Sequence, residues 1–107
     1  MSRYVFDKRR WAKLTIFEQM ANIGAEVGRA FKAKKQCDAD GLRGAVGRGL
    51  ELFDVTAESL AQEKSPRTNE VLRAREMFLE AIMTDQDDPA LEDYFMQYAI
   101  AARLHHG

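Results

Sequence analysis

Apolar side chains recur every three or four residues through most of this chain, and that spacing limits it to one class of fold. The spacing holds over residues 16–31, 42–60, 71–83 and 91–104. Because an α-helix has 3.6 residues per turn, each stretch would carry one continuous apolar stripe along a helix. Sustained alternation of apolar and polar residues, which a half-buried strand would need, is absent from the sequence. The sequence therefore predicts an all-α fold.

Each of the four predicted helices is preceded by residues that favour a helix start. Ser, Thr and Asp side chains accept hydrogen bonds from the backbone N–H groups of the first turn, and proline is tolerated at the first helical position. The expected caps are Thr15 with Glu18 as a capping box, Asp38 or Asp40, Ser65 followed by Pro66, and Asp88 followed by Pro89. Four helices of about 17 to 24 residues predict an antiparallel up-down-up-down four-helix bundle, with residues 1–107 as a single domain.

Glycines interrupt the first two predicted helices, although each costs a helix about 1 kcal/mol relative to alanine. They are Gly24 and Gly28 in the first helix, and Gly41, Gly44, Gly47 and Gly49 in the second. In an antiparallel hairpin the two sets would lie at comparable depth. We therefore expect the first two helices to approach each other closely through facing glycines.

The single cysteine, Cys37, has no partner for an internal disulfide, which favours a reducing compartment. No apolar run approaches the roughly 18 residues of a membrane span, and the N-terminus lacks the apolar core of a signal peptide. We therefore expect a cytoplasmic protein that has no membrane partner.

Residues that would carry catalysis or bind a metal ion are scarce. His105 and His106 are the only histidines and lie close to the C-terminus, so the Glu-x-x-His pairs of a di-iron bundle cannot form. Neither the cysteine nor any serine has a histidine placed to act as its general base. The sequence therefore predicts a protein that is not an enzyme, with no metal site, no cofactor and no evident small-molecule substrate.

Charge is distributed unevenly along the chain, although the net charge is only −1. Residues 1–36 carry a net charge of +6, residues 37–83 carry −3 and residues 84–107 carry −4. Such polarity suits either a contact between one end and an anionic partner or head-to-tail contacts between copies of the chain.

A basic and aromatic arm, residues 1–13, precedes the first predicted helix. Basic side chains neutralise phosphates and aromatic rings stack on unpaired bases, so this composition suits a nucleic acid. The predicted nucleic-acid-binding residues are Arg3, Lys8, Arg9, Arg10, Lys13, Lys32, Lys34 and Lys35. In the alternative interpretation Tyr4, Phe6 and Trp11 cover the open end of the bundle or a neighbouring subunit, while the charges are simply solvated.

Several charged residues lie on or beside the apolar stripes. They are Glu26, Arg48, Glu51, Arg75 and Glu76. In one interpretation they form a buried polar network of carboxylates and guanidinium groups that fixes helix register. In the other they are boundary residues whose alkyl stems lie along the core while their charges reach water. The sequence leaves both interpretations open.

Four segments carry a resemblance to a known family: WAKLTIFEQMANIGAEVGRA, GLELFDVT, LRAREMFLEAI and YFMQYAIAAR. They span most of the chain, from Trp11 to Arg103. The segments resemble a family of small bacterial four-helix-bundle proteins. That family is similar to the accessory proteins of diversity-generating retroelements and to the bundle proteins encoded in intervening sequences of ribosomal RNA genes. The resemblance implies a ring-like homo-oligomer, such as a pentamer, that assists a nucleic-acid enzyme without catalysing a reaction itself.

Two functions follow from these observations. The first is an oligomeric accessory protein that binds RNA, DNA or a reverse-transcriptase-like partner through its basic N-terminal region. The second is a protein–protein interaction and assembly module without a nucleic-acid role, self-associating through exposed parts of Tyr94, Phe95, Tyr98 and Trp11.

Overall fold

The computed structural model describes residues 7–84 and 88–104, and these residues form helices and connections without a strand. The helices are α1 (Lys8–Ala12), α2 (Ile16–Lys35), α3 (Ala39–Gln62), α4 (Arg67–Met83) and α5 (Pro89–Leu104). The all-α prediction is confirmed. The four long helices match the four predicted ones, whereas α1 lies in the arm and was not predicted as a helix.

The helix starts use the caps that the sequence predicts. The Thr15 hydroxyl accepts a hydrogen bond from the backbone N–H of Glu18 at 3.1 Å, and the Glu18 carboxylate accepts one from the Thr15 N–H at 2.9 Å. The Asp38 carboxylate accepts a hydrogen bond from the backbone N–H of Gly41, and the Asp88 carboxylate accepts one from that of Leu91, both at 3.0 Å. The Ser65 hydroxyl accepts one from the backbone N–H of Arg67 at 3.2 Å, but α4 begins at Arg67, so Pro66 lies one residue before the position predicted for it. Each cap satisfies N–H groups that have no partner within the helix.

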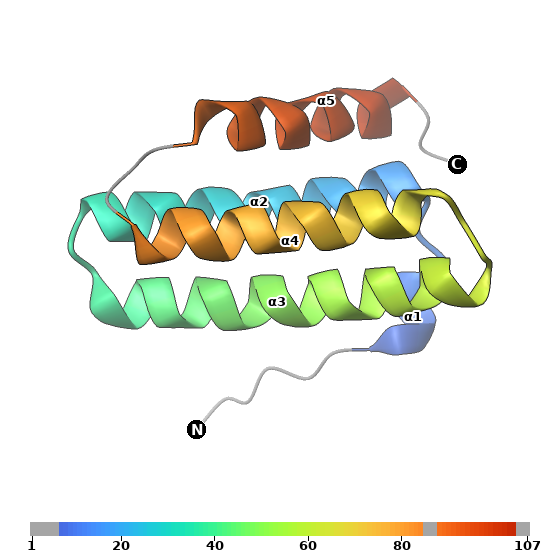
Figure 1. The fold of residues 1–107 in the computed structure, drawn as a ribbon, viewed down its shortest axis with the longest axis horizontal. Helices are drawn as coiled ribbons and strands as arrows, with labels where there is room; N and C mark the ends of the chain where they lie inside the picture. Colours follow the sequence, from blue (N-terminus) through green and yellow to red (C-terminus); the bar gives the residue numbers. More distant parts are fainter. Residues whose placement is uncertain (1–6, 85–87, 105–107) are drawn as a thin grey trace.

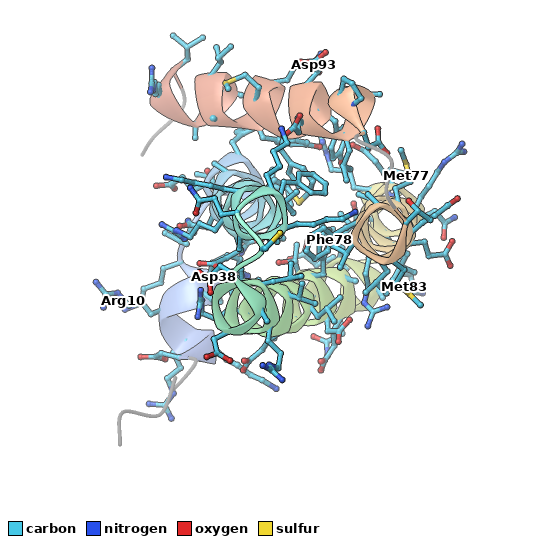
Figure 2. All side chains as sticks on the ribbon, turned by 90° about the vertical axis from the view of Figure 1, so that its left-hand side faces the viewer. Arg10, Asp38, Met77, Phe78, Met83 and Asp93 are labelled. Carbon is cyan, nitrogen blue, oxygen red and sulfur yellow. The ribbon has the colours of Figure 1, made fainter. Side chains whose placement is uncertain are left out.

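The long helices do not all run along one direction. Helices α2, α3 and α4 lie side by side along the longest axis of the molecule, with connections at alternate ends (Figure 1). A view along these three helices shows α5 from the side, so α5 crosses them obliquely (Figure 2). Helix α5 packs mainly on α2 and only sparsely on α4. The arrangement therefore differs from a regular bundle in the placement of its last helix.

One hydrophobic core joins all four long helices. Phe53 of α3 lies at its centre, with the ring centroids of Phe78 and Phe95 each 6.0 Å from its own. Met20 and Ile23 of α2 are fully buried beside these rings. Burying each such side chain contributes about 1.5–3 kcal/mol to the stability of the fold.

The closest approach of helices at a glycine is between α2 and α5, not between α2 and α3 as the glycine positions predict. A Cβ atom at Gly24 would lie 2.8 Å from the Cβ of Phe95, which places the backbone of α2 directly against α5. Gly28, one turn further on, has nothing within 4 Å of such an atom. Gly49 makes ordinary contacts with Glu26 and Phe78. The prediction of facing glycines between α2 and α3 is therefore wrong, because Gly24 faces the obliquely packed α5 instead.

Candidate functional site

Helix α1 is held against the long helices by its tryptophan. Trp11 is 8% exposed, and its indole N–H donates a hydrogen bond to the Thr56 hydroxyl of α3 at 3.0 Å. The amide of Gln19 in α2 donates to the Trp11 carbonyl oxygen at 3.0 Å. The packing role for Trp11 is therefore confirmed. Tyr4 and Phe6, the other aromatic residues of the arm, lie outside the described residues.

Helix α1 and the residue that follows it carry four basic side chains, which we call the α1 basic surface. It consists of Lys8, Arg9, Arg10 and Lys13, all of which are exposed. Figure 2 shows Arg10 extending away from the helices. Because α1 is fixed by a buried side chain, these four charges have a defined position relative to α2.

The remaining predicted basic residues lie elsewhere. Lys32, Lys34 and Lys35 belong to the last turn of α2, and 20 residues of helix separate the two ends of α2 by about 30 Å. The ammonium group of Lys34 donates to the carbonyl oxygens of Ala81, at 2.7 Å, and Thr84. It therefore caps the C-terminus of α4.

The eight predicted residues consequently do not form one patch. Four make up the α1 basic surface, three lie at the opposite end of α2, and Arg3 lies outside the described residues. The idea of a single basic end is wrong because the intervening segment is one continuous helix, which separates charges that are close in sequence.

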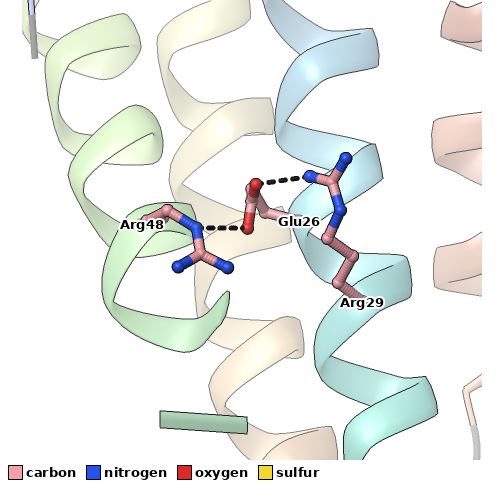
Figure 3. Close-up of polar contacts among 3 residues, drawn as sticks. All are labelled: Glu26, Arg29 and Arg48. Carbon is pink, nitrogen blue, oxygen red and sulfur yellow. Dashed lines mark hydrogen bonds and ion pairs between the residues drawn. The ribbon is translucent and has the colours of Figure 1, made fainter. Parts of the chain in front are cut away.

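The predicted polar network reduces to one cluster around a carboxylate. Glu26 has a side chain only 10% exposed, and one of its oxygens accepts a hydrogen bond from Arg48 Nε of α3 at 3.0 Å. Its other oxygen accepts from Arg29 of the same helix at 2.5 Å (Figure 3). With both oxygens engaged, the carboxylate ties α2 to α3.

The other three members of the network are placed differently. Arg75 bonds Asp54 at 2.8 Å, in a separate pair at the surface between α4 and α3. Glu51 and Glu76 are exposed, so their assignment to a buried network is wrong. Each lies two residues from a buried position, Gly49 and Phe78, and two helical residues rotate a side chain by about 200° to the opposite face.

A polar cluster between α4 and α5 was missed by reasoning from the sequence. The hydroxyl groups of Tyr94 and Tyr98 both donate to one oxygen of Glu70, at 2.7 and 2.9 Å, and Arg67 donates to the Tyr98 hydroxyl at 2.9 Å. Burial raises the pKa of both phenols above its ordinary value, and Glu70 raises it further. These bonds bridge the sparsely packed α4–α5 contact. The i, i+4 spacing of the two tyrosines is the signal that could have found them.

Helix α5 also presents a stripe of two apolar and two charged side chains to solvent, and we call it the outer stripe. It consists of Asp93, Met96, Ile100 and Arg103, at successive steps of three, four and three residues. Met96 is 61% exposed and Ile100 is 52% exposed. Figure 2 shows Asp93 pointing away from the other helices.

The aromatic residues expected to mediate self-association lie mostly on the opposite face of α5 or within the core. Phe95, Tyr98 and Trp11 are 4%, 8% and 8% exposed, and Tyr94 is half-buried. A surface made of these four residues is therefore excluded in the folded chain, because their rings already pack on neighbouring helices. The exposed large apolar side chains of α5 are Met96 and Ile100 of the outer stripe and Leu104, which is 74% exposed.

Across residues 7–84 and 88–104, no group of three His, Cys, Asp or Glu side chains is placed to hold a metal ion. In the same part of the chain no helix combines the length and apolar character needed to cross a membrane. Comparison with protein-family models, curated proteins and solved structures finds no match. The described residues thus form a small all-α protein. Its α1 carries exposed basic side chains, and its α5 carries exposed apolar ones.

Proposed function

We propose that this protein is a non-catalytic protein–protein interaction module and that the outer stripe of α5 is its docking surface. The observation that carries the proposal is the exposure of Met96 and Ile100 on a helix whose opposite face is already buried. Apolar side chains in contiguous exposed positions are typical of binding surfaces in soluble proteins. An amphipathic helix needs only one apolar face to pack on its own domain.

The apolar surface continues from α5 onto α2. A groove of about 320 Å³ lies between the two helices and is lined by small residues of α2, among them Ala25 and Gly28, and by Glu92, Met96 and Ala99 of α5. Small side chains leave room for a partner's side chains to reach close to the α2 backbone. The groove therefore extends the docking surface beyond the stripe itself.

Site-specific photocross-linking tests the proposal. A photoreactive phenylalanine analogue at position 100 is expected to give cross-linked products in cells that produce the protein. The same analogue at Met83, which is 82% exposed on α4, is the matched control and is expected to give none. Absence of any product at position 100, in a variant that retains its helical circular dichroism, would refute the proposal.

The α1 basic surface favours a second candidate function, the binding of RNA, DNA or a reverse-transcriptase-like partner that carries nucleic acid. Its support is that Trp11 fixes four exposed cations in one place, and clustered cations bind phosphates. Filter binding at low salt is the test. We expect Arg9→Glu combined with Arg10→Glu to weaken retention about tenfold.

The control for this test is the pair Lys32→Glu and Lys35→Glu, which makes the same change of charge at the far end of α2. Equal loss in both variants would indicate a non-specific effect of net charge. No retention of RNA or DNA by the unaltered protein would remove the nucleic-acid function altogether.

The remaining expectations belong to this proposal. We infer that the four long helices form an up-down-up-down bundle whose last member is tilted, since their connections lie at alternate ends (Figure 1). Self-association and a cytoplasmic setting, suited to the exposed thiol of Cys37, complete the proposed description. The family resemblance is likewise part of the proposal.

A further inference from the structure

We infer that a groove near the connection between α2 and α3 binds the phosphate group of a small molecule through Arg29, Lys32 and Arg48. We call it the hairpin groove; it has a volume of about 220 Å³. Its other lining residues are Ala33, Gln36, Asp38 and Gly41. The inference goes beyond the proposed function, because the hairpin groove shares no residue with the docking surface on α5 or with the α1 basic surface.

The two arginines of the groove are held by one carboxylate. Glu26, whose side chain is only 10% exposed, accepts a hydrogen bond from Arg48 Nε on one oxygen and from Arg29 on the other (Figure 3). A carboxylate engaged in this way restricts both guanidinium groups at the edge of the groove. Side chains that are already ordered lose less conformational entropy when a ligand binds. The groove therefore has two cations in fixed positions before any ligand arrives.

Each arginine keeps N–H donors that Glu26 does not use. Arg48 bonds Glu26 only through Nε, and Arg29 bonds it only through Nη1. In the part of the chain that the structure describes, these guanidinium groups make no other hydrogen bond, and the ammonium group of Lys32 makes none. Arginine binds phosphate through pairs of N–H donors, and lysine adds a charged donor of its own. The three side chains therefore offer several unused donors to an anion in the groove.

A glycine makes room for one of these guanidinium groups. Gly44 lies one turn before Arg48 in α3, and a Cβ atom there would lie 3.1 Å from Arg48 Nη1. A side chain at this position would push the guanidinium group outward. Gly44 thus allows Arg48 to lie along α3, where its Nε reaches Glu26.

The charge of the groove selects an anion with more than one negative charge. Three cationic side chains and the acidic Asp38 line it, for a net charge of +2. The Asp38 carboxylate caps α3 by accepting the backbone N–H of Gly41 at 3.0 Å. Glu26 offsets one positive charge, and Lys35, exposed nearly one turn after Lys32, adds one. A phosphate monoester carries about −1.5 to −2 at pH 7 and has three acceptor oxygens, so it suits three donor side chains better than a carboxylate does.

The arrangement suits a single phosphate group better than a nucleic-acid backbone. A polynucleotide strand places a phosphate about every 3.4 Å and needs cations spaced along its path. The cations of the hairpin groove are gathered in one hollow, and the α1 basic surface lies at the other end of α2. Inorganic phosphate and a phosphorylated small molecule present the same chemistry to such a site.

Isothermal titration calorimetry of the full chain at one ionic strength tests the inference, with inorganic phosphate and glucose 6-phosphate as the two probes. We expect Arg29→Gln and Lys32→Met each to weaken binding about tenfold, because each removes a charged donor. Arg43→Gln is the matched control. Arg43 bonds Asp40 at 2.8 Å with the same i, i+3 spacing that joins Arg29 to Glu26, but it does not line the groove. This control is expected to bind like the unaltered chain.

The outcomes distinguish the source of the phosphate. Equal affinity for both probes supports free phosphate as the ligand, and tighter binding of glucose 6-phosphate supports a phosphorylated small molecule. No binding of either probe at about 10 mM overturns the inference, and so does equal weakening by Arg29→Gln and Arg43→Gln. Loss of RNA retention in Arg29→Gln, without binding of either probe, would assign the groove to nucleic acid instead. Arg29 and Lys32 are exposed, and circular dichroism of each variant verifies that it folds.

Discussion

Replacing Gly24 by alanine tests the unexpected packing of α5 on α2. The added Cβ atom would lie 2.8, 3.1 and 3.2 Å from the Cβ, Cγ and Cδ1 atoms of Phe95. Carbon atoms in van der Waals contact lie about 3.5–4.0 Å apart. Helix α5 would therefore have to move away from α2 by a few tenths of an ångström or more, and because the nearest atom is the Phe95 Cβ, a rotation of the ring does not relieve the clash.

Two opposing effects set the magnitude. Alanine favours a helix over glycine by about 1 kcal/mol, whereas overpacking a close contact costs about 1–3 kcal/mol. We expect Gly24→Ala to lower the free energy of unfolding by about 1 kcal/mol. Gly28→Ala is the matched control, since nothing lies within 4 Å of its added atom. It should raise the free energy of unfolding by about 0.5–1 kcal/mol.

Urea unfolding followed by far-UV circular dichroism measures both changes. Low protein concentration keeps self-association from adding to stability. In thermal unfolding, 1 kcal/mol corresponds to a change in Tm of roughly 4 °C for a chain of this length. If Gly24→Ala stabilises the protein as much as Gly28→Ala does, α5 does not pack on the backbone of α2 and the reasoning is refuted.

Three further predictions concern polar contacts between helices. Thr56→Val removes the buried acceptor of the Trp11 indole N–H and should lower the free energy of unfolding by about 1–3 kcal/mol. Fluorescence of the single tryptophan measures this change, and an unchanged free energy would contradict the anchoring of α1. Lys34→Met should cost about 1 kcal/mol, because the ammonium group bonds the last carbonyls of α4, whereas Lys35→Met, on an exposed neighbour, should leave urea unfolding unchanged. The raised pKa values of Tyr94 and Tyr98 mean that the folded state keeps phenolic protons that the unfolded chain releases above about pH 10. Stability should be retained below that pH and lost as pH rises beyond it, and phenolate absorbance from all three tyrosines before helix loss would contradict this.

The long helices could be predicted because their determinants are local. The capping box of Thr15 and Glu18 and the aspartate caps lie within a few residues of the groups they satisfy. The apolar stripes likewise depend only on spacing within one segment. A stripe identifies the buried face of a helix, but not which helix covers it or at what angle. This is why Gly24 was assigned to the wrong neighbour and the tilt of α5 was not predicted.

The positions of the charged residues also could not be predicted from spacing along the chain. Lys13 and Lys32 belong to one basic segment of sequence, yet a continuous helix of 20 residues places them at opposite ends of α2. Glu26 and Arg48 are 22 residues apart and meet at 3.0 Å. Distance along the chain is a guide to distance in space only within a turn or two of helix. The network prediction is therefore right for Glu26 and Arg48 and wrong for Glu51 and Glu76, because spacing along the chain does not say which charged residues meet.

Helix α5 shows both limits, because inward-facing and outward-facing apolar residues follow one another along it. Phe95 and Tyr98 face inward, while Met96 and Ile100 face outward, and in the sequence they form a nearly continuous apolar run. Exposed apolar side chains that neighbour one another on a helix are typical of contact surfaces. The inner side is covered by α2, with few contacts to α4. A partner on the outer stripe, as proposed above, would cover the side of α5 on which Met96 and Ile100 are exposed.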